Sequence, residues 1–477
     1  MNHAPWRAAN LLLVAALATP IGTAASPAQP APVLRPQTVA PLPGGLDRVL
    51  LVNDNNPELI REPGILLSTF PGPGRGVPSA HLDVALSGRF DLFSHHVYAG
   101  KPESLDSTLW LAVLAAPRGS HPVTLKLLSG STALSQAVNP GQADAPFLPL
   151  PALMSQGTTP VWSGPGSRVA TELLARQRSP EIPSSWTLAP GAPTTLVVLP
   201  LPVRGLDPLL NGRNLQLRLE SSGPVSVATL AAFGSGNQPP TATSWAALLE
   251  GGLSPREHAP TPRGSKGGMV YSRVSGVQVG SVWRTRLTDP GQNWLSVRRA
   301  PISWPISSLE RGSLGTDQVQ TAELQAFYPG TAWAAHGNYG VEYDLSIPLR
   351  NDTAQPVTLQ LALESPIKGD APVGGLRFHS TPGSRPVMFR GTVEVTGLDG
   401  ETRPAGRRSF HLVQRAGEPS PALGTVSLAP GASRQLQVRL IYPADATPPQ
   451  VLSLLPSTEQ PAQQAVKQSK TTPVSPP

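Results

Sequence analysis

Five side chains that can bind metal ions or transfer protons lie within a short stretch of the sequence: His81, Asp83, Asp91, His95 and His96. On a strand, His81 and Asp83 would share a face, and only one of two adjacent histidines can face the same way. Imidazole and carboxylate groups together suit zinc and similar divalent ions. A divalent-metal site at His81, Asp83 and His95 is thus one interpretation of the pattern, although no cofactor is predicted for the chain. The alternative is structural histidines hydrogen-bonded to loops, because the helical H-E-x-x-H spacing is absent.

Two other stretches have the residue types of an ion site. The run Asn53-Asp54-Asn55-Asn56-Pro57-Glu58 offers the oxygen ligands that calcium prefers, without the glycine and spacing of an EF-hand loop. A turn whose Asn and Asp side chains bond to the backbone explains this run equally well. The run Gly164-Pro165-Gly166-Ser167-Arg168 can present N–H groups and the Arg168 guanidinium to an anion. A flexible turn is the alternative, since proline interrupts the run.

Several tryptophans lie beside Pro or Gly in turn-rich sequence. Their flat apolar rings can stack on sugar rings at low entropic cost. The opposite interpretation is burial in a sandwich core, which is the commoner fate of tryptophan in such folds. The residues predicted to bind a ligand are Trp162, Trp294, Trp304, Trp333 and Arg168.

The sequence provides no catalytic motif. It has no G-x-S-x-G elbow, no S-x-x-K with its partner motifs and no phosphate-binding loop, so no catalytic residue is predicted. There is no cysteine, which removes disulfides, thiolate nucleophiles and Cys-type zinc sites. Paired carboxylates for glycoside hydrolysis cannot be recognised in a sequence, because their separation is spatial.

The elements that must position these residues are strands. Alternating apolar residues at Leu109, Leu111, Val113 and Ala115 recur at Tyr343, Leu345, Ile347 and Leu349, which is typical of half-buried strands. Each run is followed by a Pro-Val-Thr-Leu phrase (122–125 and 356–359) and later by Leu-Ala-Pro-Gly-Ala (188–192 and 428–432). The same two phrases in the same order predict an all-β protein made of two tandem immunoglobulin-like β-sandwich domains, related by internal duplication. Only short helices are expected, at 169–178 and 244–250, the latter capped by Ser244.

The predicted organisation follows from shifts in composition. Arg7, an apolar run at 11–18 and small residues at 22–26 predict a signal peptide at 1–25. A Pro-rich linker is expected at 26–43, the first sandwich at 44–234, an inter-domain linker at 235–268 and the second sandwich at 269–455. The polar residues 456–477 are expected to be a disordered tail. No second apolar run is long enough to span a bilayer.

Several phrases together resemble a known family. They are Leu42-Pro43-Gly44-Gly45-Leu46, Gly64–Phe70, Pro78-Ser79-Ala80-His81-Leu82, Gly88-Arg89-Phe90-Asp91, Leu210-Asn211-Gly212-Arg213 and His336-Gly337-Asn338-Tyr339-Gly340. In this order, from about residue 42 to about 451, the chain resembles a family of exported cyanobacterial proteins classified only as a domain of unknown function. The resemblance implies export, and it implies no activity, cofactor or catalytic residue.

The charge of the chain favours one class of partner. The formal net charge is +7, yet basic pairs such as Arg298-Arg299 are isolated and form no nucleic-acid arm. The sequence therefore predicts an exported, non-catalytic protein of the periplasm or cell surface that binds envelope polysaccharide or an envelope protein. The alternative is a metal-assisted hydrolase acting on envelope carbohydrate, with its ion at His81, Asp83 and His95.

Overall fold

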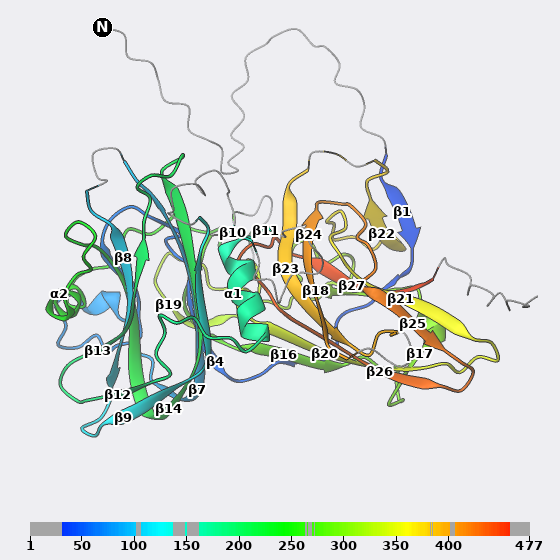
Figure 1. Ribbon diagram of the computed structural model, residues 1–477, viewed down its shortest axis with the longest axis horizontal. Helices are drawn as coiled ribbons and strands as arrows, with labels where there is room; N and C mark the ends of the chain where they lie inside the picture. Colours follow the sequence, from blue (N-terminus) through cyan, green and yellow to red (C-terminus); the bar gives the residue numbers. More distant parts are fainter. Residues whose placement is uncertain are drawn as a thin grey trace, which may run out of the picture.

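Two β-rich halves lie side by side in the computed structural model, with a short helix between them (Figure 1). The structure describes residues 31–457 apart from 102–105, 137–147, 150–161, 263–264, 266–269, 271, 382, 384 and 401–405. Within these residues almost every regular element is a strand, so the all-β prediction is confirmed. The predicted signal peptide and nearly all of the predicted tail lie outside the described residues.

The first half is built around one long strand, β14 (Leu210–Phe233). Its first part pairs with β7 (Leu86–Ala99) and β9 (Val123–Leu134), and its second part pairs with β8 (Leu109–Pro117) and β6 (Gly64–Ser68). Apolar side chains from both parts meet in one buried cluster, which includes Leu217, Val227 and Val113. The other strands of this sheet are β4 (Leu50–Asp54), β5 (Leu59–Ile60), β6 (Gly64–Ser68), β7 (Leu86–Ala99), β8 (Leu109–Pro117), β9 (Val123–Leu134), β12 (Ser185–Leu188), β13 (Thr194–Leu201), β15 (Ser275–Val279) and β19 (Leu324–Phe327).

The second half contains two sheets with the largest core of the described chain between them. One sheet holds β3 (Gly45–Leu46), β16 (Val282–Arg286), β17 (Leu295–Ser296), β20 (Glu342–Arg350), β23 (Val387–Thr396), β24 (Arg408–Arg415) and β26 (Ser433–Ile441). The other holds β2 (Thr38–Val39), β18 (Ile302–Ile306), β21 (Val357–Glu364), β25 (Gly424–Leu428) and β27 (Gln450–Pro456). Two small ribbons complete the strands: β1 (Val33–Pro36) with β22 (Gly375–Phe378), and β10 (Leu148–Pro149) with β11 (Trp162–Ser163).

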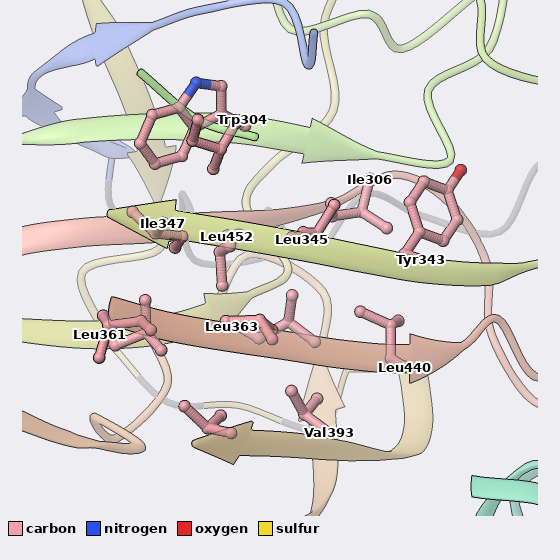
Figure 2. Close-up of a cluster of buried hydrophobic side chains, with 14 of the residues drawn as sticks. Trp304, Ile306, Tyr343, Leu345, Ile347, Leu361, Leu363, Val393, Leu440 and Leu452 are labelled. Carbon is pink, nitrogen blue, oxygen red and sulfur yellow. The ribbon is translucent and has the colours of Figure 1, made fainter. Parts of the chain in front are cut away.

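The core of the second half follows the predicted alternation. Tyr343, Leu345, Ile347 and Leu349 of β20 are all fully buried. Figure 2 shows Leu345 and Ile347 among the aliphatic side chains of the facing strands. Burying one such leucine contributes about 1.5–3 kcal/mol, so this face of β20 fixes the strand in place.

The repeated phrases occupy equivalent strand pairs in the two halves. Val123 in β9 lies opposite Leu188 in β12, and Val357 in β21 lies opposite Leu428 in β25. In both halves the strand that follows the Pro-Gly turn pairs with the strand before the Pro-Val-Thr-Leu phrase: β13 with β8, and β26 with β20. The parallel neighbours are also alike, because β4 runs parallel to β7 as β2 runs parallel to β18.

Strand pairing crosses the predicted boundaries. Part of the segment predicted as a Pro-rich linker forms β1 and β2, which pair with β22 and β18 of the second half. Conversely, β15 and β19 lie in the expected second domain but extend the sheet of the first half, through β4. Pro36 ends β1 at the edge of a two-stranded ribbon, where the missing N–H of proline is tolerated. Each half is therefore completed by chain from the other part of the sequence.

Two α-helices are present in the described part of the chain. Helix α1 (Pro165–Leu174) begins four residues before the predicted start, with proline in its first turn, and packs against strands of both halves. Helix α2 (Ala242–Leu248) is capped by Thr241, whose side chain accepts a hydrogen bond from the Ser244 N–H, so Ser244 is not the cap. The described residues also form two short 3-10 helices, η1 (Pro78–Ala80) and η3 (Val297–Arg299). Among the described residues, no helix has the length and hydropathy to cross a membrane.

Candidate functional site

The three residues predicted to bind a metal ion have different partners. The His81 Nδ1 atom lies 2.7 Å from the Ser68 hydroxyl in a buried position. Asp83 is half exposed, and its carboxylate accepts a hydrogen bond from Arg118 at 2.7 Å. His95 on β7 lies 4.0 Å from Glu58. Across the described ranges, no three His, Asp or Glu side chains are arranged to hold a metal ion. The metal-assisted hydrolase therefore gains no support from the geometry.

His95 belongs to a buried polar region between the two halves. Burial lowers the pKa of His95, against the opposing effects of Glu58 and of Asp445 from the second half. Burial also raises the pKa of Asp445, whose carboxylate accepts the N–H of Ser167 in the first turn of α1. This region joins the halves through hydrogen bonds and charge, which is a structural role.

The acidic and amide run 53–58 is used within the fold. The Asn53 amide donates to Gln278 at 2.9 Å, and the Asn56 amide donates to the Arg273 carbonyl at 3.0 Å. Asp54 accepts from His96 at 2.9 Å, and both side chains are fully buried. These contacts connect β4 to the chain that follows the predicted boundary, and they favour the structural interpretation of the run over the calcium site.

The five residues predicted to bind a ligand lie in different parts of the fold and differ in how far they are buried. Trp304 is buried in the core of the second half, next to Leu452 on the neighbouring strand β27 (Figure 2). Its ring is therefore not available to a ligand. Trp162 lies in β11, and its side chain is outside the described part. Arg168 lies on α1 and pairs with Glu172 at 3.6 Å. Trp294 is half-buried beneath the Arg350 guanidinium. Trp333 lines a cavity.

That cavity has a volume of about 330 Å³, at the lower end of the range of small-molecule sites. Its walls are mainly apolar, and Ala332 and Ala335 at its base belong to a small buried cluster with Leu324. The polar groups that reach it are few. The described residues that line it are Pro260, Thr261, Pro262, Val270, Ser272, Leu309, Glu310, Val319, Thr321, Glu323, Ala332, Trp333, Ala334 and Ala335. We call this cavity the Trp333 groove.

The segment that forms one wall of the Trp333 groove is held by an amide network. The Asn338 amide donates to the Gln320 carbonyl at 2.8 Å, and its carbonyl oxygen accepts the Ala322 N–H at 3.2 Å. The Leu324 N–H donates to the Trp333 carbonyl at 2.8 Å. Because the wall is fixed on both sides by buried hydrogen bonds, the groove is formed before any ligand arrives.

Ser272 is the most informative polar group of the groove. Its side chain is 1% exposed, and its hydroxyl oxygen has no hydrogen-bond partner in the described part of the chain. Buried hydroxyls are almost always hydrogen-bonded, because leaving one unsatisfied costs about 1–3 kcal/mol. The oxygen is covered in this structure, so a ligand hydroxyl or amide in the groove would supply the missing partner once the Ser272 side chain rotates towards it.

Sequence reasoning selected Trp333 but missed Ser272, Glu310 and Glu323. Ser272 follows the breaker-rich stretch that was predicted as a linker, and nothing in its local pattern distinguishes it from a loop serine. The described residues of the groove come from parts of the chain that are far apart in the sequence: 260–262 with 270 and 272, then 309–310, and then 319–335. Only the three-dimensional arrangement could bring them together.

Fold and groove define an all-β protein with a preformed, mainly apolar cavity. Within that class the chain belongs to the family described as "Protein of unknown function (DUF3370)", whose profile matches residues 37–456. No curated protein matches the chain.

Proposed function

We propose that this protein is an exported envelope protein that binds polysaccharide without catalysis, through the Trp333 groove. Support for export comes from the sequence pattern at 1–25 and from the resemblance to exported cyanobacterial proteins. The proposed final location is the periplasm or the cell surface.

The observation that carries the proposal is the pairing of Trp333 with Ser272 in one cavity. A sugar ring presents apolar C–H groups on its face and hydroxyls at its edge. The first suit the indole of Trp333, and the second suit the Ser272 hydroxyl. Glu310 and Glu323 also line the cavity and can accept hydrogen bonds from further sugar hydroxyls.

We further propose that the two halves arose by duplication of an immunoglobulin-like unit. The matching registers of β9 with β12 and of β21 with β25 support this proposal. The exchange of β2, β15 and β19 between the halves would have followed the duplication and would have joined the copies into one body.

The test is calorimetric titration of the full chain with a β-1,4-linked N-acetylglucosamine tetramer and with solubilised peptidoglycan fragments. We expect Trp333→Leu to weaken binding roughly tenfold, because an aromatic stacking contact is worth about 0.5–1.5 kcal/mol beyond its area. Ser272→Ala should weaken binding by a smaller factor.

The matched control is Trp110→Leu, which removes a half-buried indole of β8 that does not line the groove and should leave this binding unchanged. Equal weakening by both variants, or no binding of any glycan, would refute the groove as a sugar site. In the second case an envelope protein would be the partner to seek.

A further inference from the structure

A second surface with aromatic and basic character lies at the far end of the second half. Strand β20 starts at the junction of the halves with Glu342 and ends at Arg350, which is about 26 Å further along the sheet. There β17 runs parallel to β20, and the chain just before β17 carries Trp294. The Arg350 guanidinium lies over the Trp294 ring at 5.5 Å.

Arg286, Arg298 and Arg299 lie within eight residues of Trp294 in the sequence, and together with Arg350 they differ in how their charge is balanced. Arg298 pairs with Asp352 at 3.4 Å, and Arg299 pairs with Asp289 at 2.5 Å. Arg286 donates to the Asn293 carbonyl at 3.0 Å, and the Arg350 guanidinium lies over the Trp294 ring. Within the described ranges, neither Arg286 nor Arg350 has a carboxylate partner, and both are exposed.

We propose that Trp294, Arg286 and Arg350 form a binding surface for an acidic polysaccharide, separate from the Trp333 groove. A uronic acid ring would stack on the indole, while its carboxylate would accept hydrogen bonds from a guanidinium fork, which matches a carboxylate in shape and charge. The loop 287–294 holds the ring in place, since the Asp289 N–H donates to the Trp294 carbonyl at 2.9 Å.

The arrangement fits a sugar acid better than a nucleic acid. Protein–DNA interfaces engage many phosphates along a strand, and affinity depends on their number. Here only two arginines lack a carboxylate partner, and they flank one aromatic ring. One ring with two cations matches one or two acidic sugar units. With the Trp333 groove at the other end of β20, the chain would bind two different polymers at once.

The experiment is titration of the full chain with oligogalacturonate, with a neutral N-acetylglucosamine tetramer and with single-stranded DNA as comparison probes. We expect oligogalacturonate to bind, and the double variant Arg286→Gln/Arg350→Gln to weaken it roughly tenfold. The slope of log affinity against log salt should become shallower by about two, one for each lost cation.

Matched controls distinguish binding at this surface from binding that depends only on net charge and from binding in the Trp333 groove. Arg61→Gln removes an exposed arginine of the first half and should leave oligogalacturonate binding unchanged. Trp333→Leu should also leave oligogalacturonate binding unchanged. The proposal for this surface can therefore be refuted without refuting the Trp333 groove, and the groove can be refuted without refuting this surface. Trp294→Phe keeps an aromatic ring and should retain most of the affinity, whereas Trp294→Leu should not.

Three outcomes would overturn the proposal. They are equal binding of the double variant and the original chain, equal affinity for the neutral tetramer and oligogalacturonate at this surface, and stronger binding of single-stranded DNA. Thermal unfolding of each variant checks that it is folded, and the double variant changes only exposed side chains.

Discussion

Glu342 joins the two halves of the molecule, and replacing it tests whether their junction depends on charge. Its side chain is 6% exposed. One carboxylate oxygen lies 2.8 Å from Arg218 of the first half, and the other lies 2.7 Å from Arg439 of the second. Arg218 also lies 3.8 Å from Asp91, and Arg439 lies 3.2 Å from Glu394. Glu342→Gln keeps the shape of the side chain and removes its charge.

The expected loss of stability in Glu342→Gln depends on the partners that Arg218 and Arg439 keep. Removing one partner of a buried ion pair costs about 3–5 kcal/mol when the other charge is left alone. Here each arginine keeps a second carboxylate and a partly exposed side chain, 13% for Arg218 and 25% for Arg439. We therefore expect Glu342→Gln to lower the free energy of unfolding by about 2–3 kcal/mol at neutral pH.

The pH dependence gives the sign of the effect. Burial acts to raise the pKa of Glu342, but Arg218 and Arg439 outweigh it and hold the pKa below the ordinary value of 4.5. The folded state thus favours the ionised form, and this stabilisation is present above pH 4.5 and is lost as the pH falls through the folded pKa. The difference in unfolding free energy between the original chain and Glu342→Gln should therefore become smaller in acid.

The assay is urea unfolding of the original chain, of Glu342→Gln and of Glu220→Gln, at neutral pH and well below pH 4.5. Glu220 lies on exposed sheet surface and provides the same chemical change without a buried partner. The reasoning is refuted if the two variants lose equal stability, or if the Glu342 deficit persists unchanged in acid.

Two further predictions concern other buried positions of the fold. Burial acts to lower the pKa of His96, but Asp54 raises it above 6.5, so its stabilisation is present below pH 6.5 and is lost as the pH rises through the folded pKa. In urea titrations His96→Gln should therefore cost more stability in mild acid than in base, and exposed His121→Gln should show no such trend. Gly166→Ala would place a Cβ 2.7 Å from backbone of the second half, so thermal or urea unfolding should show a loss of about 1–3 kcal/mol. Gly45→Ala meets nothing within 4 Å, and an equal loss there would contradict the packing argument.

The all-β class could be predicted because its signal is local. The alternation in 343–349 requires one face of a strand to be buried, and the structure buries all four residues of that face. The Pro-Gly turns at 190–191 and 430–431 likewise fix where each following strand begins. These features depend on residues a few positions apart, which is the range that a sequence pattern records.

The path of the N-terminal segment could not be predicted in the same way. Strand β2 has only two residues, too few to show alternation, and β1 ends at a proline. Both find their partners more than 200 residues later, at β18 and β22. A segment whose structure comes from distant partners resembles a linker when it is read alone.

Most of the wall of the Trp333 groove comes from a segment that the proposed duplication does not explain. Under the duplication, β7 corresponds to β18 and β8 to β20. The chain joins β7 to β8 through residues 100–108, but it joins β18 to β20 through residues 307–341, which carry β19 and Trp333. The extra chain reaches back to the first sheet and forms most of the groove wall. Binding sites are commonly built on loops that a rigid scaffold positions. The segment without a counterpart in the other half is therefore where a specific function is expected, and the repeat that reveals the fold cannot reveal the site.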